Sequence, residues 1–309
     1  MTYQAKILAD SVSPAGHRLT TQEVTMPRIV LAEFNTHRVL SRNSASSRAI
    51  PVEKQLKNVL EEPFVPDYWG INQKGMQAEQ KLDRRESAEA TGEWLCRRDL
   101  ALLGAVALIG GVKSIQDEAL KKRIGALQAL HGEVDKPLGR PVHKQLANRL
   151  LEPFMWHTVI VTATEWDNFY ALRANSQAQP EIRQTAEAMR QAYLQSEPAE
   201  VDYGQWHLPL IQSDERHLAV SSLVKISAGR CARVSYLTHA GQRDPQEDIA
   251  LYERLTASGH MSPLEHVARP LLPEEMRRSV WSGNFRGWHQ HRKDIPNEDN
   301  FARGDNFER

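Results

Sequence analysis

The sequence predicts an α+β fold that is mostly helical and contains a small antiparallel sheet. YQAKILAD (3–10) reads as a short strand, and polar and apolar residues roughly alternate in LTTQEVTM (19–26). WHTVIVTA (156–163) is rich in β-branched residues and predicts a third strand. Most of the remaining periodic segments have helical spacing, above all residues 76–131. These observations together favour a mainly helical protein around a few strands.

The helices are placed by their start and stop residues. Pro27 suits a first helical turn and predicts a helix that ends before Pro51; its buried face would be Ile29, Val30, Leu31 and Phe34. Gly110–Gly111 divides residues 76–131 into two helices, and Pro153 ends a helix over HKQLANRLLEPF. Further helices are expected over residues 165–173, 181–195 and 246–257.

The chain has 309 residues, enough for one large domain or two smaller ones. The polar stretch 197–216, with prolines and acids, is the best candidate for a linker or long loop. We expect an N-terminal part (1–196) and a C-terminal part (217–309) that together form one catalytic unit.

The composition limits the kind of ligand and compartment. The 39 basic residues balance the 39 acidic ones, so an anion site has to be built locally. Cys96 and Cys231 have no metal-binding or redox spacing, and the N-terminus lacks a signal-peptide pattern. The longest apolar run, 101–109, is about half a membrane span. We therefore expect a cytoplasmic protein with no membrane partner.

The segment FNTHRVLSRNSASSRAIP (34–51) is unusually rich in hydrogen-bond donors. Arginine offers a planar fork for phosphate, and serine and asparagine add uncharged donors. The donors that we select are His37, Arg38, Asn43, Ser46 and Arg48. This pattern indicates a phosphate-bearing ligand, although composition alone favours a solvated helix end with an Asx/Ser turn.

Two later segments also carry candidate residues. In NFYALRANSQAQPEI (168–182), helical spacing places Arg173, Ser176 and Gln177 on one face, which suits the edge of a planar heterocycle or an ordinary polar kink. In GHMSPLEHVA (259–268), His260 and His266 are six residues apart. That spacing is not that of a helical metal pair, so no metal site is expected; a loop followed by a helix start is the plain structural alternative.

These segments resemble the flavin-dependent thymidylate synthase family. The pattern HR-x-x-S-x-N-x-x-S-x-R at 37–48 is similar to the family signature of Arg-His-Arg, seven residues, then Ser. NFYALRANSQAQPEI, CARVSY and SGHMSPLEH resemble three further family segments. In the family the last two precede the signature, whereas here they follow it. The motif order therefore looks circularly permuted or half-duplicated: SPAGH before THR (36–38) is echoed by SPLEH before QHR (290–292).

The resemblance implies an enzyme that transfers a one-carbon unit from methylenetetrahydrofolate to C5 of dUMP, with FAD reduced by NADPH. No cysteine nucleophile is used, so both cysteines are expected to be structural. The partner is then a small pyrimidine deoxynucleotide rather than nucleic acid, and the chain would form a homo-oligomer, a dimer or a tetramer.

The resemblance also implies residue roles. Ser46, Arg48 and Arg149 would bind the nucleotide phosphate, Arg173 would face the pyrimidine, and His260 would lie near folate and flavin. The residues that match FAD contacts are His37, Arg38, Asn43, Asn168, Gln177, Ser235, Ser262 and Glu265.

Departures from the family pattern bear on the product. Thr36, Ser44, Ala49 and Gln177 replace the family's arginine, glutamate, tyrosine and histidine. A hydroxymethylated pyrimidine, from dUMP or dCMP, is therefore an open alternative. A non-catalytic nucleic-acid-binding protein is the alternative of another class, but it needs a basic face with stacking aromatic residues.

Overall fold

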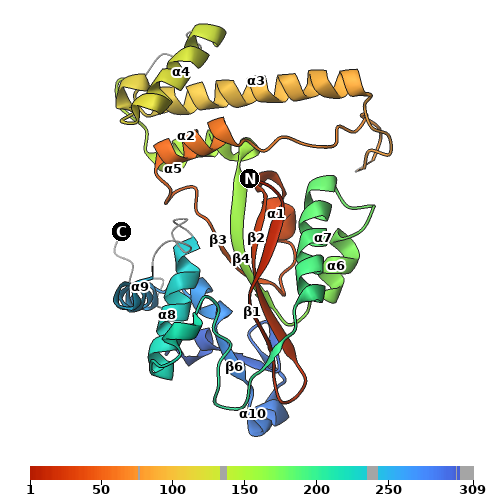
Figure 1. Ribbon diagram of the computed structural model, residues 1–309, viewed down its shortest axis with the longest axis vertical. Coiled ribbons are helices and arrows are strands. Elements are labelled where there is room, and N and C mark those ends of the chain that lie inside the picture. The colour runs from red at the N-terminus through yellow and green to blue at the C-terminus, as the bar shows by residue number, and fades with distance from the viewer. Residues whose placement is uncertain (76, 133–137, 235–242, 297, 300–309) are drawn as a thin grey trace.

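The structure is a computed structural model that describes residues 1–75, 77–132, 138–234, 243–296 and 298–299 (Figure 1). At its centre is a five-stranded sheet in the order β3-β4-β2-β1-β5. All neighbours are antiparallel except the pair of β1 and β5. The strands are β1 (Gln4–Val12), β2 (Arg18–Pro27), β3 (Ser41–Ser44), β4 (Trp156–Ala163) and β5 (Ala199–Glu200).

Helices surround the sheet on both faces and at one end. The predicted α+β class with a small, mainly antiparallel sheet is confirmed. The helices of the N-terminal part are η1 (Arg28–Val30), α1 (Leu31–Phe34), α2 (Val52–Glu61), α3 (Arg84–Leu108), η2 (Val112–Ser114), α4 (Glu118–His131), α5 (Lys144–Ala147), η3 (Asn148–Phe154), α6 (Asp167–Arg173) and α7 (Pro180–Gln195). Those after it are η4 (Ser213–Glu215), α8 (Val220–Arg233), α9 (Pro245–Ala257), η6 (Ser262–His266), α10 (Pro273–Arg278) and η7 (His291–Asp294), with short strands β6 (Ala268–Pro270), β7 (Trp281–Ser282), β8 (Phe285–Arg286) and β9 (Trp288–Gln290).

Side-chain alternation along β4 gives the sheet two different faces. Val159 and Val161 face α6 and α7, where they join a core with Phe169, Ile182 and Met189. The residue between them, Ile160, packs instead against Cys231 and Val234 at the end of α8. Figure 1 shows the result: α6 and α7 lie on one side of the sheet, α8 and α9 on the other, and α3 crosses above its end.

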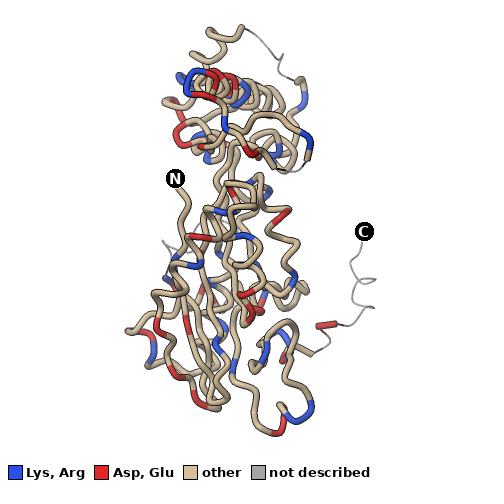
Figure 2. Tube along the Cα trace, turned by 90° about the vertical axis from the view of Figure 1, so that its right-hand side faces the viewer, with Lys and Arg blue, Asp and Glu red and all other residues tan. Residues whose placement is uncertain are grey.

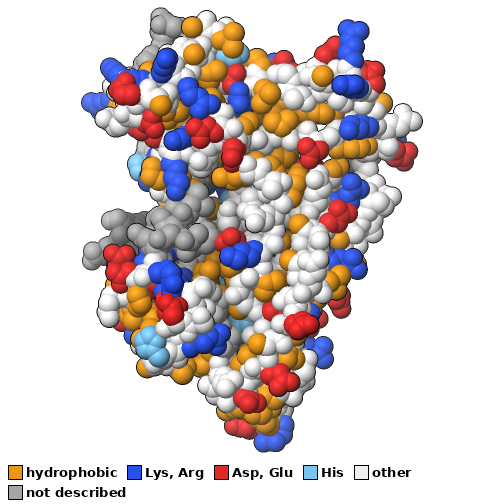
Figure 3. Space-filling view, in the orientation of Figure 1, with side chains coloured by type: hydrophobic (Ala, Val, Ile, Leu, Met, Phe, Trp, Pro, Cys, Tyr) orange, Lys and Arg blue, Asp and Glu red, His pale blue; other side chains and the backbone are white. Residues whose placement is uncertain are grey.

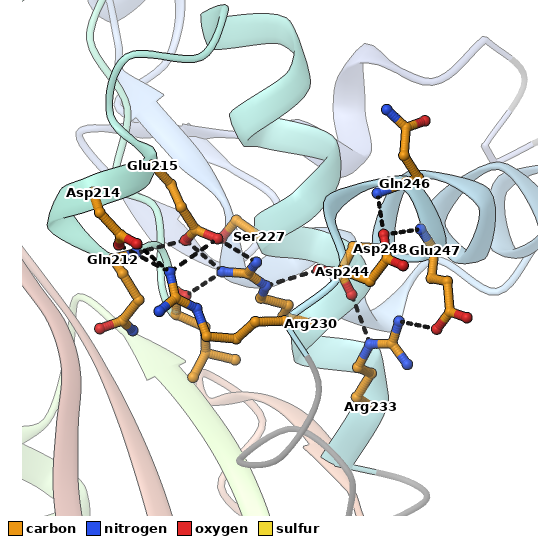
Figure 4. A network of polar contacts seen from close by, with 12 residues as sticks. Gln212, Asp214, Glu215, Ser227, Arg230, Arg233, Asp244, Gln246, Glu247 and Asp248 are labelled. Carbon is orange, nitrogen blue, oxygen red and sulfur yellow. Dashed lines mark hydrogen bonds and ion pairs between the residues drawn. The ribbon is translucent and has the colours of Figure 1, made fainter.

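A buried ion-pair network joins α8 to α9 and η4 (Figure 4). Arg230, 2% exposed, donates to Asp248 at 2.8 Å and to both carboxylate oxygens of Glu215 at 2.6 and 2.7 Å. Arg233 also donates to Asp248, at 2.6 Å. A Cβ at Gly229 would lie 2.3 Å from the carbonyl oxygen of Asp248, so α9 can approach α8 this closely only because position 229 is glycine. Because each buried charge has a partner, the network holds α8 in place.

Three expected helix boundaries are wrong. The helical segment begins directly after Pro27, as expected, but it ends at Phe34 and not just before Pro51. Residues 41–44 pair with the open edge of β4 because ladder hydrogen bonds outweigh local propensity. Residues 77–83 are not helical: Asp83 and Glu86 form a capping box that starts α3 at Arg84. Pro153 lies inside η3 and does not end a continuous helix from 143.

A buried chain of hydrogen bonds crosses the sheet. The His207 ring contacts Ser11 and Thr21 at 2.8 Å each, and Thr21 contacts Thr162 at 2.7 Å. Thr162 contacts Nδ1 of His266 at 2.8 Å. Burial lowers the pKa of both histidines, His207 and His266, to about 3, so both rings are neutral near pH 7.

Within the described part of the chain, no helix has the length and hydropathy needed to cross a bilayer.

We predict that stability falls as the pH decreases from about 6.5 to 5. Burial lowers the pKa of His157, as well as of His207 and His266, to about 3, so the unfolded state, with pKa values near about 6.5, takes up these protons first. Below about pH 6.5, each ring should lower the free energy of unfolding by up to about 1.4 kcal/mol per pH unit. Above that pH, the rings should have no effect on it. Denaturant unfolding across this pH range measures the slope.

His207→Gln should reduce the dependence of the free energy of unfolding on pH. The matched control is His143→Gln, at an exposed position, which should leave that dependence unchanged. A free energy of unfolding that stays constant between pH 7 and 5 contradicts the neutral, buried state of these rings.

Candidate functional site

The donor-rich stretch meets the C-terminal part of the chain at Asn43. Cross-strand pairing places Asn43 opposite Ile160, on the sheet face that packs against α8. Its amide donates to the carbonyl of Cys231 at 2.7 Å, and its oxygen accepts from Ser262 at 3.3 Å. Asn43 therefore links the donor-rich stretch to two segments that lie about two hundred residues later in the sequence. The Cys231 thiol is fully buried, and burial raises its pKa far above the usual range, so it is not a thiolate nucleophile.

Beside Asn43 lies a cleft of about 390 Å³, which we call the arginine pocket. Both parts of the chain line it: Arg38, Leu40, Arg42, Ser262, Glu265, Gly283, Asn284, Gln290, Arg292 and Lys293. Of the predicted site residues, the structure brings Arg38, Ser262 and Glu265 together here, next to Asn43.

The charges of the arginine pocket are mostly positive. Arg292 donates to Glu265 at 2.6 Å and to Glu298 at 2.7 Å, and Lys293 also pairs with Glu298. Arg38 is exposed and has no partner among the described residues. Arg42 is held by the carbonyl oxygen of His37 at 3.0 Å. Four cations against two carboxylates leave a net positive charge that suits an anion.

Amide and hydroxyl groups fix the wall of this pocket. Asn284 donates to the carbonyl of Val39 at 2.8 Å and accepts from Gln290 at 2.8 Å. The Ser41 hydroxyl lies 3.1 Å from the Asn284 side-chain oxygen. A Cβ at Gly283, whose φ is +60°, would lie 2.0 Å from the Gln290 side-chain oxygen. A side chain at position 283 would therefore displace the Gln290 amide, and the positive φ also favours glycine there.

His37 and Arg173 form a second group of predicted residues. Nε of Arg173 donates to Nε2 of His37 at 2.9 Å, and Arg173 also forms an ion pair with Glu33. Burial, followed by the charges of Arg173 and Arg42, lowers the pKa of His37. A neutral ring is what the hydrogen bond from Arg173 requires, because the accepting nitrogen must carry no proton.

Ser47, which stands between Ser46 and Arg48 in the chain, and Arg149 both contact Glu152 at a third place, which we call the Glu152 corner. Glu152 accepts from Ser47 at 3.0 Å and from Arg149 at 2.8 Å. Asn148 donates to the carbonyl of Ser47 at 2.6 Å, which fixes the turn that holds Ser46 and Arg48. The turn and the start of η3 are therefore neighbours. Arg48 is exposed and has no partner in the described ranges.

The remaining predicted residues do not join these groups. Asn168 is exposed at the start of α6, and His260 is exposed with Nδ1 3.0 Å from the Ser258 hydroxyl. Gln177 lines a different cleft. Because α6 ends at Arg173, the expected helical face shared by Arg173, Ser176 and Gln177 is wrong. Ser235 lies outside the described residues.

The prediction missed seven of the ten residues that line the arginine pocket, among them Arg42, Asn284, Gln290, Arg292 and Lys293. The echo of THR in QHR (290–292) was the available signal, and Arg292 takes a place close to Arg38. The other half of the echo has no structural counterpart, because SPAGH forms the turn between β1 and β2 whereas SPLEH forms η6.

Comparison with known proteins agrees with the motifs. A family model described as "Thymidylate synthase complementing protein" matches residues 6–199. Two structures of a UMP/dUMP methylase PolB from Streptomyces cacaoi are similar in fold, one bound with 5-Br UMP and the other with 5-Br dUMP. The first is 15% identical, covers 62% of this chain and 88% of that chain, and has a TM-score of 0.41. The second is 14% identical, covers 62% and 90%, and also has a TM-score of 0.41.

No curated protein matches the sequence. The family match ends at residue 199, so the CARVSY and GHMSPLEH segments and seven of the ten residues that line the arginine pocket lie beyond it. Because the matched region spans more than half of the 309 residues, the chain belongs to the thymidylate synthase complementing protein family.

Proposed function

We propose that the protein transfers a one-carbon unit from methylenetetrahydrofolate to C5 of dUMP, with FAD that NADPH reduces. The observation that carries the proposal is the arginine pocket, in which Arg38 of the family signature and its neighbour Arg42 line one cleft with Arg292 and Lys293. Such a concentration of cations, in a chain of zero net charge, calls for a phosphate-bearing ligand.

The arginine pocket suits the diphosphate of FAD. Arg38 has no partner in the described part of the chain, and Ser262 and Asn284 add uncharged groups on the wall. Glu265 holds Arg292 in position, so its role is to orient the guanidinium and not to touch the anion. FAD, once bound, supplies the hydride. Asn168, Gln177, Ser235 and His37 remain proposed flavin contacts, and His260 a proposed neighbour of folate.

The Glu152 corner suits the phosphate of dUMP. Among the described residues, Arg48 has no partner, and Arg149 has one, Glu152, in a surface contact that contributes little. A dianion can take Arg149 from the carboxylate, because a doubly charged phosphate with three oxygens is the better acceptor for two arginines. Ser46 lies in the turn between them.

Arg173 is proposed to bind the pyrimidine. His37 and Glu33 fix its Nε and one Nη, which leaves the other Nη to donate to a pyrimidine carbonyl. Holding the base in one orientation lowers the entropy cost of reaching the transition state.

We also propose that the enzyme is a homo-oligomer.

A hydroxymethylated dUMP or dCMP is the second candidate product. It rests on Ser44 and Ala49, which stand where the family has glutamate and tyrosine beside the signature. The nucleic-acid-binding alternative finds no support in the charge distribution, because Figure 2 shows lysine and arginine interspersed with acidic residues along the described chain.

We expect dTMP to form when the protein is incubated with dUMP, methylenetetrahydrofolate, FAD and NADPH. Mass spectrometry of the nucleotide measures the product, and omission of FAD should abolish its formation. Addition of a hydroxymethyl group would support the second candidate. Unchanged dUMP and dCMP, with a folded protein and bound flavin, would contradict one-carbon transfer to a pyrimidine.

We expect Arg149→Ala to weaken dUMP binding by about tenfold to a hundredfold, because a charge-assisted hydrogen bond contributes about 1.5–3 kcal/mol. FAD affinity should stay unchanged, since its proposed ligands lie elsewhere. Calorimetric titration of both ligands measures this. Arg97→Ala is the matched control, because Arg97 is an exposed helical arginine paired with Glu93.

Arg48→Lys should weaken dUMP binding as well, since a point charge does not replace a bidentate fork. If Arg149→Ala binds dUMP as tightly as Arg97→Ala does, the Glu152 corner is not the phosphate site.

A further inference from the structure

The Glu152 corner contains a further arginine, Arg28, which belongs to none of the family-like segments. Arg28 begins η1, and its Nη2 donates to Oε1 of Glu152 at 3.1 Å. The same oxygen accepts from the Ser47 hydroxyl at 3.0 Å and from Nη1 of Arg149 at 2.8 Å. One carboxylate oxygen therefore takes donors from three segments of the chain: η1, the turn after β3, and η3.

This set of donors is the one that a phosphate oxygen takes in proteins, because guanidinium and hydroxyl groups form charge-assisted hydrogen bonds with it. In the Glu152 corner a carboxylate of the chain takes them instead. The face of the molecule drawn in Figure 3 shows acidic and basic side chains intermixed over the surface, and the corner follows the same pattern. An anion that enters it has to compete with Glu152 for the arginines.

The two arginines are held with different strength. The Arg28 side chain is 14% exposed, its Nη1 lies 3.0 Å from Nδ1 of the neutral His157, and its backbone N–H donates to the carbonyl of Met155 at 2.8 Å. The Arg149 side chain is 48% exposed. Separating a buried cation from its carboxylate is costly, whereas an exposed pair contributes little. Glu152 therefore stays with Arg28, and Arg149 is the arginine that a ligand can take.

The charges also favour the departure of Arg149. Burial lowers the pKa of Arg28, the carboxylate of Glu152 opposes this effect, and the charge of Arg149 lowers the pKa further. Arg28 and Arg149 therefore repel each other across the oxygen that they share. When Arg149 turns to an outside anion, this repulsion decreases, and Arg28 and Glu152 remain as a balanced pair.

We propose that Glu152 determines the specificity of this corner as a built-in competitor, which admits an anion only if it draws Arg149 away from a carboxylate. The inference rests on the proposed phosphate site for dUMP. A phosphate monoester carries a charge of about −1.5 to −2 near pH 7 and offers three acceptor oxygens. A phosphodiester carries a single charge, so at Arg149 it replaces the carboxylate by an equal charge. The corner therefore selects a terminal phosphate group over the internal phosphate of a polynucleotide.

A competitor has the opposite effect on affinity from a ligand contact. After Arg149 has moved, the Glu152 carboxylate still lies beside the bound anion and repels it. Every anion therefore binds more weakly than it would to the same arginines without Glu152. Removal of the charge should strengthen binding, whereas loss of a residue that only holds the turn in place should weaken it.

Calorimetric titration with dUMP and, separately, with inorganic phosphate tests the inference. Glu152→Gln should strengthen the binding of both by about tenfold, because the amide keeps an acceptor for Arg28 but has no charge that competes for Arg149. The matched control is Glu93→Gln, since Glu93 also pairs with an exposed arginine, Arg97, and should leave both affinities unchanged. The methyl ester of dUMP should bind the wild-type protein at least about tenfold more weakly than dUMP does.

A second variant keeps the test valid if Glu152→Gln does not fold, because that change leaves Arg28 without its counter-charge. The double variant of Arg28→Gln with Glu152→Gln removes both charges. It should bind dUMP at least as tightly as the wild-type protein, since the charge that competes for Arg149 is gone. Circular dichroism checks that each variant is folded.

The inference and the proposed function fail in different ways. Equal or weaker binding of both ligands in folded Glu152→Gln, weaker binding of dUMP in the double variant, or no binding of either ligand overturns the inference, even if dTMP forms. Stronger binding of phosphate in Glu152→Gln without any conversion of dUMP supports the competition and contradicts the proposed function alone.

Discussion

The pairing of β3 with the edge of β4 is the constraint on which the candidate site depends. It aligns Ser41 with Thr162 and Asn43 with Ile160, and alternation then turns Ser41 and Asn43 toward the C-terminal part. Arg38 lies just before this strand and lines the arginine pocket, and the turn of the Glu152 corner follows it. A strand of four residues therefore positions two proposed phosphate sites, one at each of its ends.

The C-terminal part adds to a site that the family match alone leaves incomplete. Residues 6–199 contain the signature arginines, but Glu265, Arg292 and Lys293 come from beyond the match. The Arg230 network fixes α8, and the carbonyl of Cys231 in that helix accepts the hydrogen bond from Asn43. The buried charges outside the site therefore help to hold the two parts of the arginine pocket together.

The sequence predicted the strands better than it predicted the site. Alternation of polar and apolar residues identified β2, and a run of β-branched residues identified β4, almost to the residue. β3 was taken for a helix end, since SRNS has no strand propensity and pairs only because β4 offers an open edge. Likewise, Arg38, Ser262 and Glu265 were identified from motifs, whereas Asn284 and Lys293 carry no local pattern and reach the pocket only through the tertiary fold.

The central claim is that both parts of the chain bind the same anion, and a double-mutant cycle on FAD affinity tests it most directly. Arg38→Gln, Arg292→Gln and the double variant are titrated with FAD, and flavin fluorescence is measured. If both arginines contact one diphosphate, the losses of FAD binding free energy in the two single variants should not add, and the coupling energy should exceed about 0.5 kcal/mol. In the control cycle of Arg38→Gln with Arg97→Ala, the two losses should add within that limit. Additive effects of Arg38 and Arg292, or no effect of either on FAD affinity, would contradict a shared site.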